Sequence, residues 1–393
     1  MTFEPRYRRG DSGAAVAEIR RKLRLLGLLP GGLSGERGEF ALETAVFDEA
    51  TDRAVRTFQQ QHGILVDGVV GPVTYHALDE ARWRLGDRIV CYVPGRLMAG
   101  DDVATLQQRL LDMGFDCGRV DGLFGVETEQ ALREFQRNVG LVADGTCGPA
   151  TLKALDRLSR TVTGGSPHAM RESEAINRAG PTLAGKLVIV DPGHGGPDPG
   201  VLGQPLDEGQ LMYDLASRVE GRLTATGCSA FLTRGPEPAE GALSVEEALS
   251  VDGRAAFANA AGADLLVSLH VAAHSNPQAH GVATFYWGND RFGHHSLMGR
   301  RFANLVQREI CARTDLLDCR THALNLDLLR RTRMPAVRLE VGYLTNPGDS
   351  ARLADPAFRD VIAEAVVVAV QRLYLPPEED AETGFLRIPA LRA

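Results

Sequence analysis

An internal repeat organises the first 155 residues of this 393-residue chain. Residues 54–74 and 131–151 align at a constant offset of 77, which pairs Phe58 with Phe135. Upstream, the offset rises to 87, so the first copy carries about ten extra residues around positions 31–40, as surface loops tolerate. Each copy is therefore expected to be one small folding unit, the first over residues 10–80 and the second over residues 98–157.

Each copy has the pattern of three short helices. Val103, Leu106 and Leu110 recur at helical spacing, and Gly114 follows as a left-handed stop. A second helix carries Phe135, and Asp-Gly and Gly-Pro pairs mark the turn before a third. The repeated residues are mostly core and turn positions, so a helical spacer that binds nothing remains an alternative interpretation.

The rest of the chain alternates strand and helix patterns. Short apolar runs predict strands at residues 186–191, 229–233, 264–270, 281–287, 324–329 and 336–340. Longer amphipathic stretches predict helices at residues 206–226, 245–261, 296–313 and 360–373. Together they predict an α/β layered domain at residues 185–375, with a mixed sheet flanked by helices.

Two segments show no sustained periodicity. Residues 158–184 are predicted to form an interdomain linker. Residues 376–393 begin with prolines and acidic residues, which predicts a disordered tail. Within that tail, the apolar residues 384–389 could dock on a partner protein.

Composition excludes several functional classes. Asp and Glu number 51 against 43 Lys and Arg, for a net charge of −8, and no basic face for nucleic acid is evident. No apolar run is long enough to span a bilayer, and the N-terminus has no apolar segment after its basic residues. We therefore expect a soluble chain without a Sec-type signal and with a cytoplasmic location.

The six cysteines have irregular spacings and no C-x-x-C pair. This pattern favours buried free thiols in a reducing compartment over a cysteine zinc site or a dense disulfide framework. A bridge between Cys117 and Cys147 remains an alternative.

The strongest chemical signal is the apolar run at residues 187–190, which ends in the glycine-flanked His194. His270 and Glu340 end two other apolar runs, and Glu208 stands at the head of an amphipathic stretch. Sites in layered α/β sheets lie beyond the carboxyl ends of the strands. We therefore expect His194, His270 and Glu340 along one rim of the sheet.

These residue types fit zinc chemistry. A catalytic zinc takes three nitrogen or oxygen ligands and keeps an open position for water, whose pKa falls to about 7. His194, Glu208 and His270 would supply such a set. Amide hydrolysis also needs a group that accepts the proton of water and passes it to the leaving amine, a role that Glu340 could take. The pattern predicts a zinc hydrolase.

Each of these residues also has an ordinary interpretation. A histidine in a glycine loop is often structural, and Glu208 could be a charge in the first turn of a helix. Glu340 could be paired with Arg338. His274 invites an H-x-x-x-H interpretation with His270, but that spacing needs a helix, so His274 is expected to be exposed.

Several ordered motifs resemble the zinc-dependent N-acetylmuramoyl-L-alanine amidases of the amidase-3 type. The resemblance runs from about Lys186 to Leu373, and it rests on residues 190–200, Glu208, residues 232–234, residues 268–270 and residues 335–346. It implies that His194, Glu208 and His270 are the zinc ligands and that Glu340 is the catalytic glutamate. It also implies cleavage of the amide bond between N-acetylmuramic acid and the L-alanine of the stem peptide.

The N-terminal repeats resemble the peptidoglycan-binding domain of bacterial wall hydrolases through their Phe-Gln, Asp-Gly and Gly-Pro-x-Thr elements. Tandem copies would raise avidity for a polymer such as peptidoglycan. The whole layout is similar to that of the actinobacterial CwlM group.

The sequence departs from the family pattern after His270. Val271, Ala272 and Ala273 stand where the family usually has Ala-Asn-Ala, which would remove an asparagine hydrogen bond and could weaken activity. Family members are usually extracytoplasmic, whereas this chain shows no export signal. The alternative function is therefore a non-catalytic cytoplasmic regulator of peptidoglycan synthesis that binds precursors or partner proteins.

Overall fold

The computed structural model describes residues 6–30, 45–158, 167–203, 205–235, 250–289 and 291–375. The chain forms two compact units. Residues 1–170 and 288–294 make one, here called the helical unit, and residues 171–287 and 295–393 make the other, here called the sheet unit. The predicted loop at 31–40 and the predicted tail lie outside the described residues.

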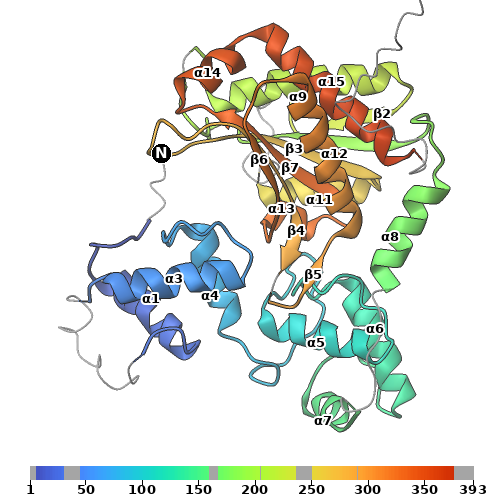
Figure 1. Cartoon of the computed structure of the whole chain (residues 1–393). Coiled ribbons are helices and arrows are strands. Elements are labelled where there is room, and N and C mark those ends of the chain that lie inside the picture. The colour runs from blue at the N-terminus through green and yellow to red at the C-terminus, as the bar shows by residue number, and fades with distance from the viewer. Residues whose placement is uncertain are drawn as a thin grey trace, which may run out of the picture. The chain divides into compact units, whose positions relative to one another are not determined.

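The two repeats of the helical unit each contribute three described helices, as the sequence predicts (Figure 1). The first repeat has α1 (Ala14–Leu25), α3 (Glu49–Gln61) and α4 (Pro72–Ala81), and the second has α5 (Asp101–Asp112), α6 (Val126–Asn138) and α7 (Pro149–Leu158). Each repeat has its own apolar core, built around Phe58 in the first and Phe135 in the second. Cys117 and Cys147 are buried free thiols in the second core.

In each repeat, one buried glutamine forms hydrogen bonds with most of the motif residues that the two repeats share. Gln59 Nε2 donates to Asp67 Oδ1 at 2.7 Å and to Thr74 Oγ1 at 3.2 Å, and Gln59 Oε1 accepts from the backbone N–H of Gly68 at 2.9 Å. Gln136 makes the matching bonds in the second repeat at 2.7, 3.1 and 2.9 Å. The turn that closes over the glutamine needs a positive φ at Gly68, +74°, which glycine adopts without strain. The shared motifs therefore serve the fold.

Residues 288–294 belong to the helical unit although they follow a strand of the sheet unit in sequence. Arg291 Nη1 lies 2.9 Å from His62 Nε2, at the end of α3, and also pairs with Asp101, the first residue of α5. His294 Nε2 contacts the side-chain oxygen of Gln108. The segment thus contacts both repeats, a role that no sequence pattern indicated.

The sheet unit is built on a mixed sheet with seven described strands. They are β1 (Leu187–Pro192), β2 (Ser229–Leu232), β3 (Leu265–Ala272), β4 (Val282–Asn289), β5 (His294–His295), β6 (Asp318–Leu324) and β7 (Ala336–Tyr343). The order is β2-β1-β3-β7-β4-β5, with β6 also paired to β4. Strands β2, β1, β3 and β7 are parallel, whereas β4 runs antiparallel to β7. The carboxyl ends of β1, β3 and β7 therefore meet at one edge.

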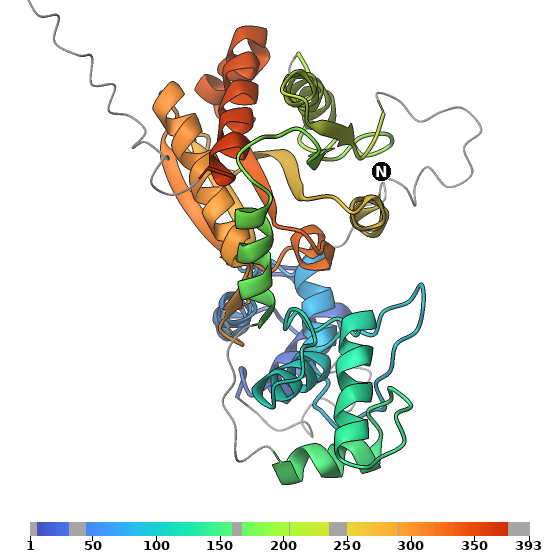
Figure 2. The same ribbon diagram turned by 90° about the vertical axis from the view of Figure 1, so that its right-hand side faces the viewer.

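Helices cover both faces of this sheet. Val188 and Val190 of β1 belong to the same apolar core as residues of α9 (Glu208–Ala225), α12 (Leu297–Arg313) and α15 (Pro356–Leu373). Ile189 points to the opposite face and packs with α11 (Val251–Ala261) and α13 (Asp327–Arg331). Helices α12 and α15 run side by side (Figure 2). The order of layers confirms the predicted fold class.

The strand predicted at 324–329 is wrong. Strand β6 ends at Leu324, and α13 begins at Asp327. A short apolar run such as Leu328-Leu329 fits a strand or a buried helical turn equally well by periodicity. Here Leu329 enters the core beneath the sheet from a helix.

The segment predicted as a linker, 158–184, contains the helix α8 (Pro167–Arg178). Ile176 of α8 is buried in the core of the sheet unit. The chain after the helix is held by Lys186, whose ammonium group donates to the carbonyl oxygens of Ala179 and Gly180 at 3.0 and 2.9 Å. The helix α14 (Pro347–Ala354) was also not predicted.

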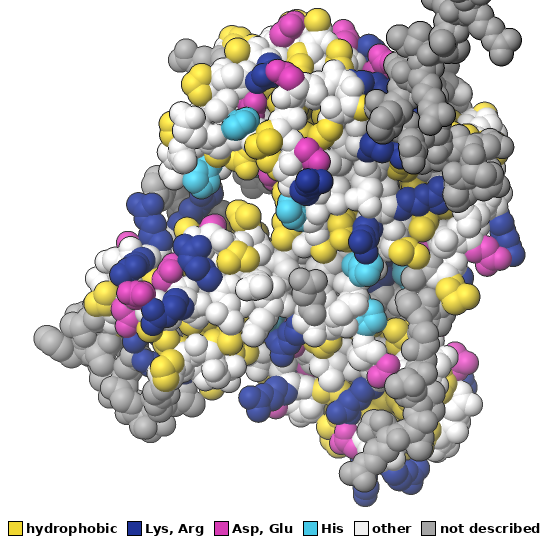
Figure 3. All heavy atoms as spheres, in the orientation of Figure 1, with side chains coloured by type: hydrophobic (Ala, Val, Ile, Leu, Met, Phe, Trp, Pro, Cys, Tyr) yellow, Lys and Arg dark blue, Asp and Glu magenta, His cyan; other side chains and the backbone are white. Residues whose placement is uncertain are grey.

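No helix among the described residues combines the length and apolar character that a membrane span requires. On the face drawn in Figure 3, Lys and Arg side chains lie among Asp and Glu side chains.

Replacing the buried glutamine of the first repeat should loosen that repeat selectively. In Gln59→Met the apolar side chain leaves the buried Gly68 N–H without its acceptor, at a cost of about 1–3 kcal/mol, and removes one of the two donors to Asp67 Oδ1. Hydrogen exchange of the full chain should show faster exchange at the Gly68 amide. Gln60→Met changes the exposed neighbour and should leave exchange at Gly68 as it is; equal exchange in both variants would contradict the assignment.

Candidate metal centre

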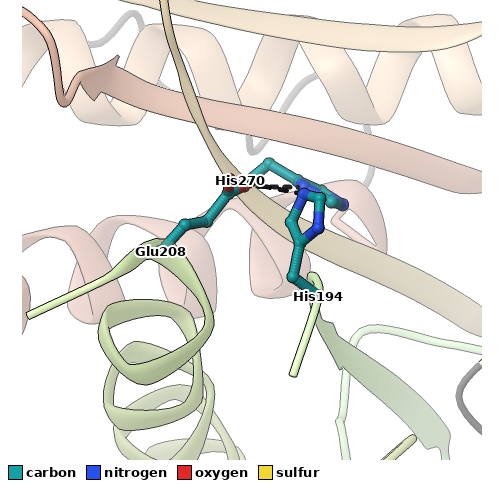
Figure 4. Close-up of side chains that lie close together, drawn as sticks. All are labelled: His194, Glu208 and His270. Carbon is teal, nitrogen blue, oxygen red and sulfur yellow. Dashed lines mark hydrogen bonds and ion pairs between the residues drawn. The ribbon is translucent and has the colours of Figure 1, made fainter. Parts of the chain in front are cut away.

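Three elements bring His194, Glu208 and His270 together. His194 lies in the loop after β1, Glu208 is the first residue of α9, and His270 lies near the end of β3. One ligand atom from each lies within 4.8 Å of the others. Figure 4 shows the three side chains pointing toward one another. The convergence expected at the strand ends is therefore present for both histidines.

The loop that carries His194 is held by two arginines. Arg254 donates to the carbonyl oxygens of Pro192 and His194, both at 2.7 Å. Arg234 donates to the carbonyl oxygens of Pro192 and Gly193 at 3.0 and 3.2 Å. His194 itself has a φ of +56°, a conformation uncommon for residues other than glycine. Such a conformation persists only where the surroundings fix it, as these guanidinium groups do.

Asp191, at the end of β1, anchors Arg254. Its carboxylate accepts from Arg254 Nη1 at 2.7 Å, from Ser268 Oγ at 2.6 Å and from Thr233 Oγ1 at 2.5 Å. Burial alone would raise the pKa of Asp191, but the charge of Arg254 and the two hydroxyl groups outweigh it and hold the pKa below its usual value. The carboxylate is therefore ionised and paired beneath the loop.

Glu208 is a buried carboxylate at the centre of the cluster. Its Oε1 lies 3.0 Å from His270 Nδ1, and its Oε2 lies 3.3 Å from His194 Nε2. The backbone N–H groups of Val271 and Val201 donate to the same two oxygens at 3.1 and 3.0 Å. Burial would raise the pKa of Glu208, but His270 and then His194 lower it to about 2. The group carries a negative charge at neutral pH.

The two imidazoles differ in environment. Burial, helped by the positive charge of Arg338, lowers the pKa of His270 to about 4, so its ring is neutral at pH 7. His194 Nδ1 lies 2.7 Å from Asp198 Oδ2, and this contact directs Nε2 toward Glu208. A carboxylate that orients a histidine in this way is typical of metal centres. Neutral imidazole nitrogens and a carboxylate are the ligand types that zinc takes.

Glycines make room for the cluster. A Cβ atom at Gly193 would stand 2.3 Å from His270 Cε1. One at Gly200 would stand 2.6 Å from Glu208 Oε2 and 2.8 Å from the His194 ring. Real Cβ atoms essentially never approach so closely, so the three ligands can converge only because these positions lack side chains.

Glu340 lies on β7 directly beside His270, because the two residues are paired in the β3–β7 register. Arg338 Nε and Nη2 both contact Glu340 Oε1, at 3.1 and 3.0 Å. Oε2 accepts no hydrogen bond from the residues that the structure describes. Burial raises the pKa of Glu340, and the negative charge of Glu208 adds to this, whereas Arg338 opposes it. The ion pair considered as the ordinary interpretation is therefore present, at the rim of the cluster.

Sequence reasoning missed the residues that support the ligands. Asp191 and Asp198 flank the glycine loop and could have been noticed as acids within a short motif, but Arg254 carries no local signal. Val271 contacts Glu208 through its backbone N–H, so this contact does not depend on the side chain at position 271. The asparagine usual in the family is replaced by Ala272, and none of the residues that the structure describes supplies a group in its place. His274 is exposed, as expected.

Comparisons with known proteins cover nearly all of the chain. Residues 188–372 match the family described as N-acetylmuramoyl-L-alanine amidase, and residues 12–78 and 99–155 match a peptidoglycan binding domain. The chain is 48% identical over 392 residues to the N-acetylmuramoyl-L-alanine amidase CwlM of Mycobacterium tuberculosis. This alignment covers 98% of this chain and 93% of that protein.

Two further relatives match about half of the chain. The germination-specific N-acetylmuramoyl-L-alanine amidase of Bacillus subtilis is 28% identical over 206 residues, covering 50% of this chain and 84% of that protein. The solved structure of amidase AmiC2 from Nostoc punctiforme is 29% identical, with a TM-score of 0.41 and coverage of 48% of this chain and 96% of that chain.

The close approach at Gly193 predicts a sensitive position. Gly193→Ala should push the His270 ring away from Glu208 and weaken the uptake of added Zn²⁺ by the metal-free protein, measured by calorimetry. Gly221→Ala is the matched control, since a Cβ there meets nothing within 4 Å inside α9, and its zinc uptake should equal that of the unsubstituted chain. Equal uptake in both variants would show that the ligands do not need this space.

Proposed function

We propose, because the chain belongs to the N-acetylmuramoyl-L-alanine amidase family, that it hydrolyses the amide bond between N-acetylmuramic acid and L-alanine in peptidoglycan. The observation that supports this most strongly is the juxtaposition of His194, Glu208 and His270 within 4.8 Å, with Glu340 beside them. Two imidazoles, a buried carboxylate and a neighbouring carboxylate are the groups that metal-assisted amide hydrolysis needs.

The ligand set favours Zn²⁺ as the resident ion. His194, Glu208 and His270 would hold it, and the ionised Glu208 would supply the charge that a buried dication requires. When bound, zinc supplies a Lewis acid that lowers the pKa of water to about 7. Asp198 keeps the His194 ring in place, and the backbone N–H groups of Val201 and Val271 fix the Glu208 carboxylate.

Glu340 is proposed to move the proton. Arg338 contacts Oε1 through two nitrogen atoms and leaves Oε2 as the atom that can accept a proton from the attacking water. The same oxygen then donates this proton to the nitrogen of the leaving L-alanine, which must depart as a neutral amine. Arg338 fixes the orientation of the carboxylate through this contact.

The repeats are proposed to hold the polymer. Their shared glutamine, aspartate and threonine residues are occupied by hydrogen bonds within each repeat, so contacts with peptidoglycan would come from other surface residues. Two copies would raise the local concentration of the chain on a polymer with repeating units.

Removing the proton acceptor should separate binding from turnover. Glu340→Gln keeps the size of the side chain but cannot accept the proton, so release of stem peptides with a new L-alanine N-terminus should fall by at least about 10²-fold. Zinc content should stay at one ion per chain. Glu364→Gln makes the same change at an exposed position of α15 and should keep full release. Full release by Glu340→Gln would remove Glu340 from the mechanism.

Removing the metal should abolish activity reversibly. Chelation should stop hydrolysis, and added Zn²⁺ should restore it together with one bound ion per chain, measured by elemental analysis. His270→Ala should lose both the ion and the activity, whereas His76→Ala, at an exposed position of α4, should lose neither. A chain that binds zinc yet releases nothing from polymer or soluble fragments would favour the alternative of a non-catalytic regulator.

A further inference from the structure

Arg338 connects Glu340 to a row of side chains on neighbouring strands. Residues two apart on a strand share a face of the sheet, so Arg338 and Glu340 lie on the same side of β7. Arg338 is paired with Phe285 of β4, and Phe285 is paired with His322 of β6. We call Arg338, Phe285 and His322 the lateral row. It extends from the candidate metal centre toward the β6 edge.

The guanidinium group of Arg338 has donor capacity that the fold does not use. Its Nε and Nη2 atoms both contact Glu340 Oε1, and Nη1 donates to none of the residues that the structure describes. The side chain is 29% exposed, so solvent and ligands can reach it. Among the described residues, Glu340 is the one carboxylate within ion-pair distance of Arg338. An incoming anion would therefore find a fixed cation with free N–H groups.

The rest of the lateral row carries no negative charge. Phe285 is buried in the core beneath the sheet, and the exposed His322 ring lies against it. The Phe285 and His322 rings lie 5.8 Å apart between centroids at an angle of 32°. His322 Nε2 lies 2.7 Å from the carbonyl oxygen of Cys319, which holds the ring in place. His322 is exposed on the edge strand. The accessible members of the row are therefore Arg338 and His322.

The chemistry of the reaction places the leaving peptide near this row. Glu340 must come within about 2.6–3.2 Å of the leaving nitrogen to give it a proton. That nitrogen belongs to the first residue of the stem peptide, so the second residue must lie within a few bonds of Glu340. Arg338 contacts Glu340 directly, and among the described residues it is the one cation within ion-pair distance of this carboxylate. The second stem residue carries a carboxyl group that is either free or amidated, and arginine binds carboxylates through paired N–H groups.

We propose that Arg338 is a specificity-determining residue that binds the free carboxylate of the second stem residue, so that the chain prefers acidic stem peptides over amidated ones. The placement of the peptide rests on the proposed function. An amidated stem would present an N–H₂ group to the guanidinium, which has no acceptor to offer it. The amidated stem should therefore be hydrolysed with a lower kcat/KM, as happens when a site built to hydrogen-bond one group meets a substrate that lacks it.

The test uses two soluble muropeptides that differ only at the second stem residue. One carries a free carboxylate there, and the other carries a carboxamide. The zinc-loaded chain should hydrolyse the acid with a kcat/KM about tenfold higher than that of the amide. Arg338→Met keeps the length of the side chain and should hydrolyse both with equal efficiency. Arg333→Met, at an exposed position before β7, should keep the preference. Arg338→Lys should keep part of it, because a point charge replaces the planar donor group.

Two patterns would overturn the proposal. One is equal hydrolysis of both muropeptides by the unsubstituted chain. The other is an equal loss on both in Arg338→Met with the preference retained, which would leave Arg338 as a residue that only positions Glu340. Equilibrium binding of the same two muropeptides, measured without turnover, separates this proposal from the proposed function. A binding preference for the acid that Arg338→Met removes would support the carboxylate contact even if neither compound were hydrolysed, whereas equal binding would overturn it.

Discussion

The buried ion pair between Asp191 and Arg254 is the contact on which the candidate site depends. It stands at the end of β1, and the same guanidinium group extends to the carbonyl oxygens of Pro192 and His194. Breaking a buried pair by removing one partner typically costs about 3–5 kcal/mol, because a charge is left buried alone. The pair fixes where the strand stops and where the glycine loop turns, and the direction of the His194 ring follows from that.

The charge states of Glu208 and His270 depend on burial and on their hydrogen-bonded partners, which shift their pKa values in opposite directions. Burial disfavours the charged form of every group, yet Glu208 stays ionised because two histidines and two backbone N–H groups face it. His270 is held neutral because its burial and the nearby Arg338 outweigh its bond to Glu208. The neutral His270 imidazole and the anionic Glu208 carboxylate therefore lie side by side. These are the protonation states in which histidine and glutamate bind metals.

Local patterns predicted the parts of the fold that local forces decide. Apolar runs located β1, β3, β4 and β7, and because β1, β3 and β7 are parallel, the pattern also indicated that His194, His270 and Glu340 would share a rim. The role of Glu208 as a metal ligand could not be derived from its place at the start of a helix. That prediction depended on the resemblance to the family motif. The helix at Asp327–Arg331 was mistaken for a strand because Leu329 is buried in either structure. Arg254 stands 63 residues from Asp191, a separation that no spacing rule covers.

The segment 288–294 shows that the helical unit is discontinuous in sequence. Its first part ends at residue 170, and its last contacts come from Arg291 and His294, which the ribosome adds only after most of the sheet has been made. A protease that cut the chain after residue 170 would therefore release the repeats without the arginine that contacts His62 and Asp101. During synthesis, the two repeats could each form their cores early, but the contacts that this segment makes with both of them must wait for a later stage of translation.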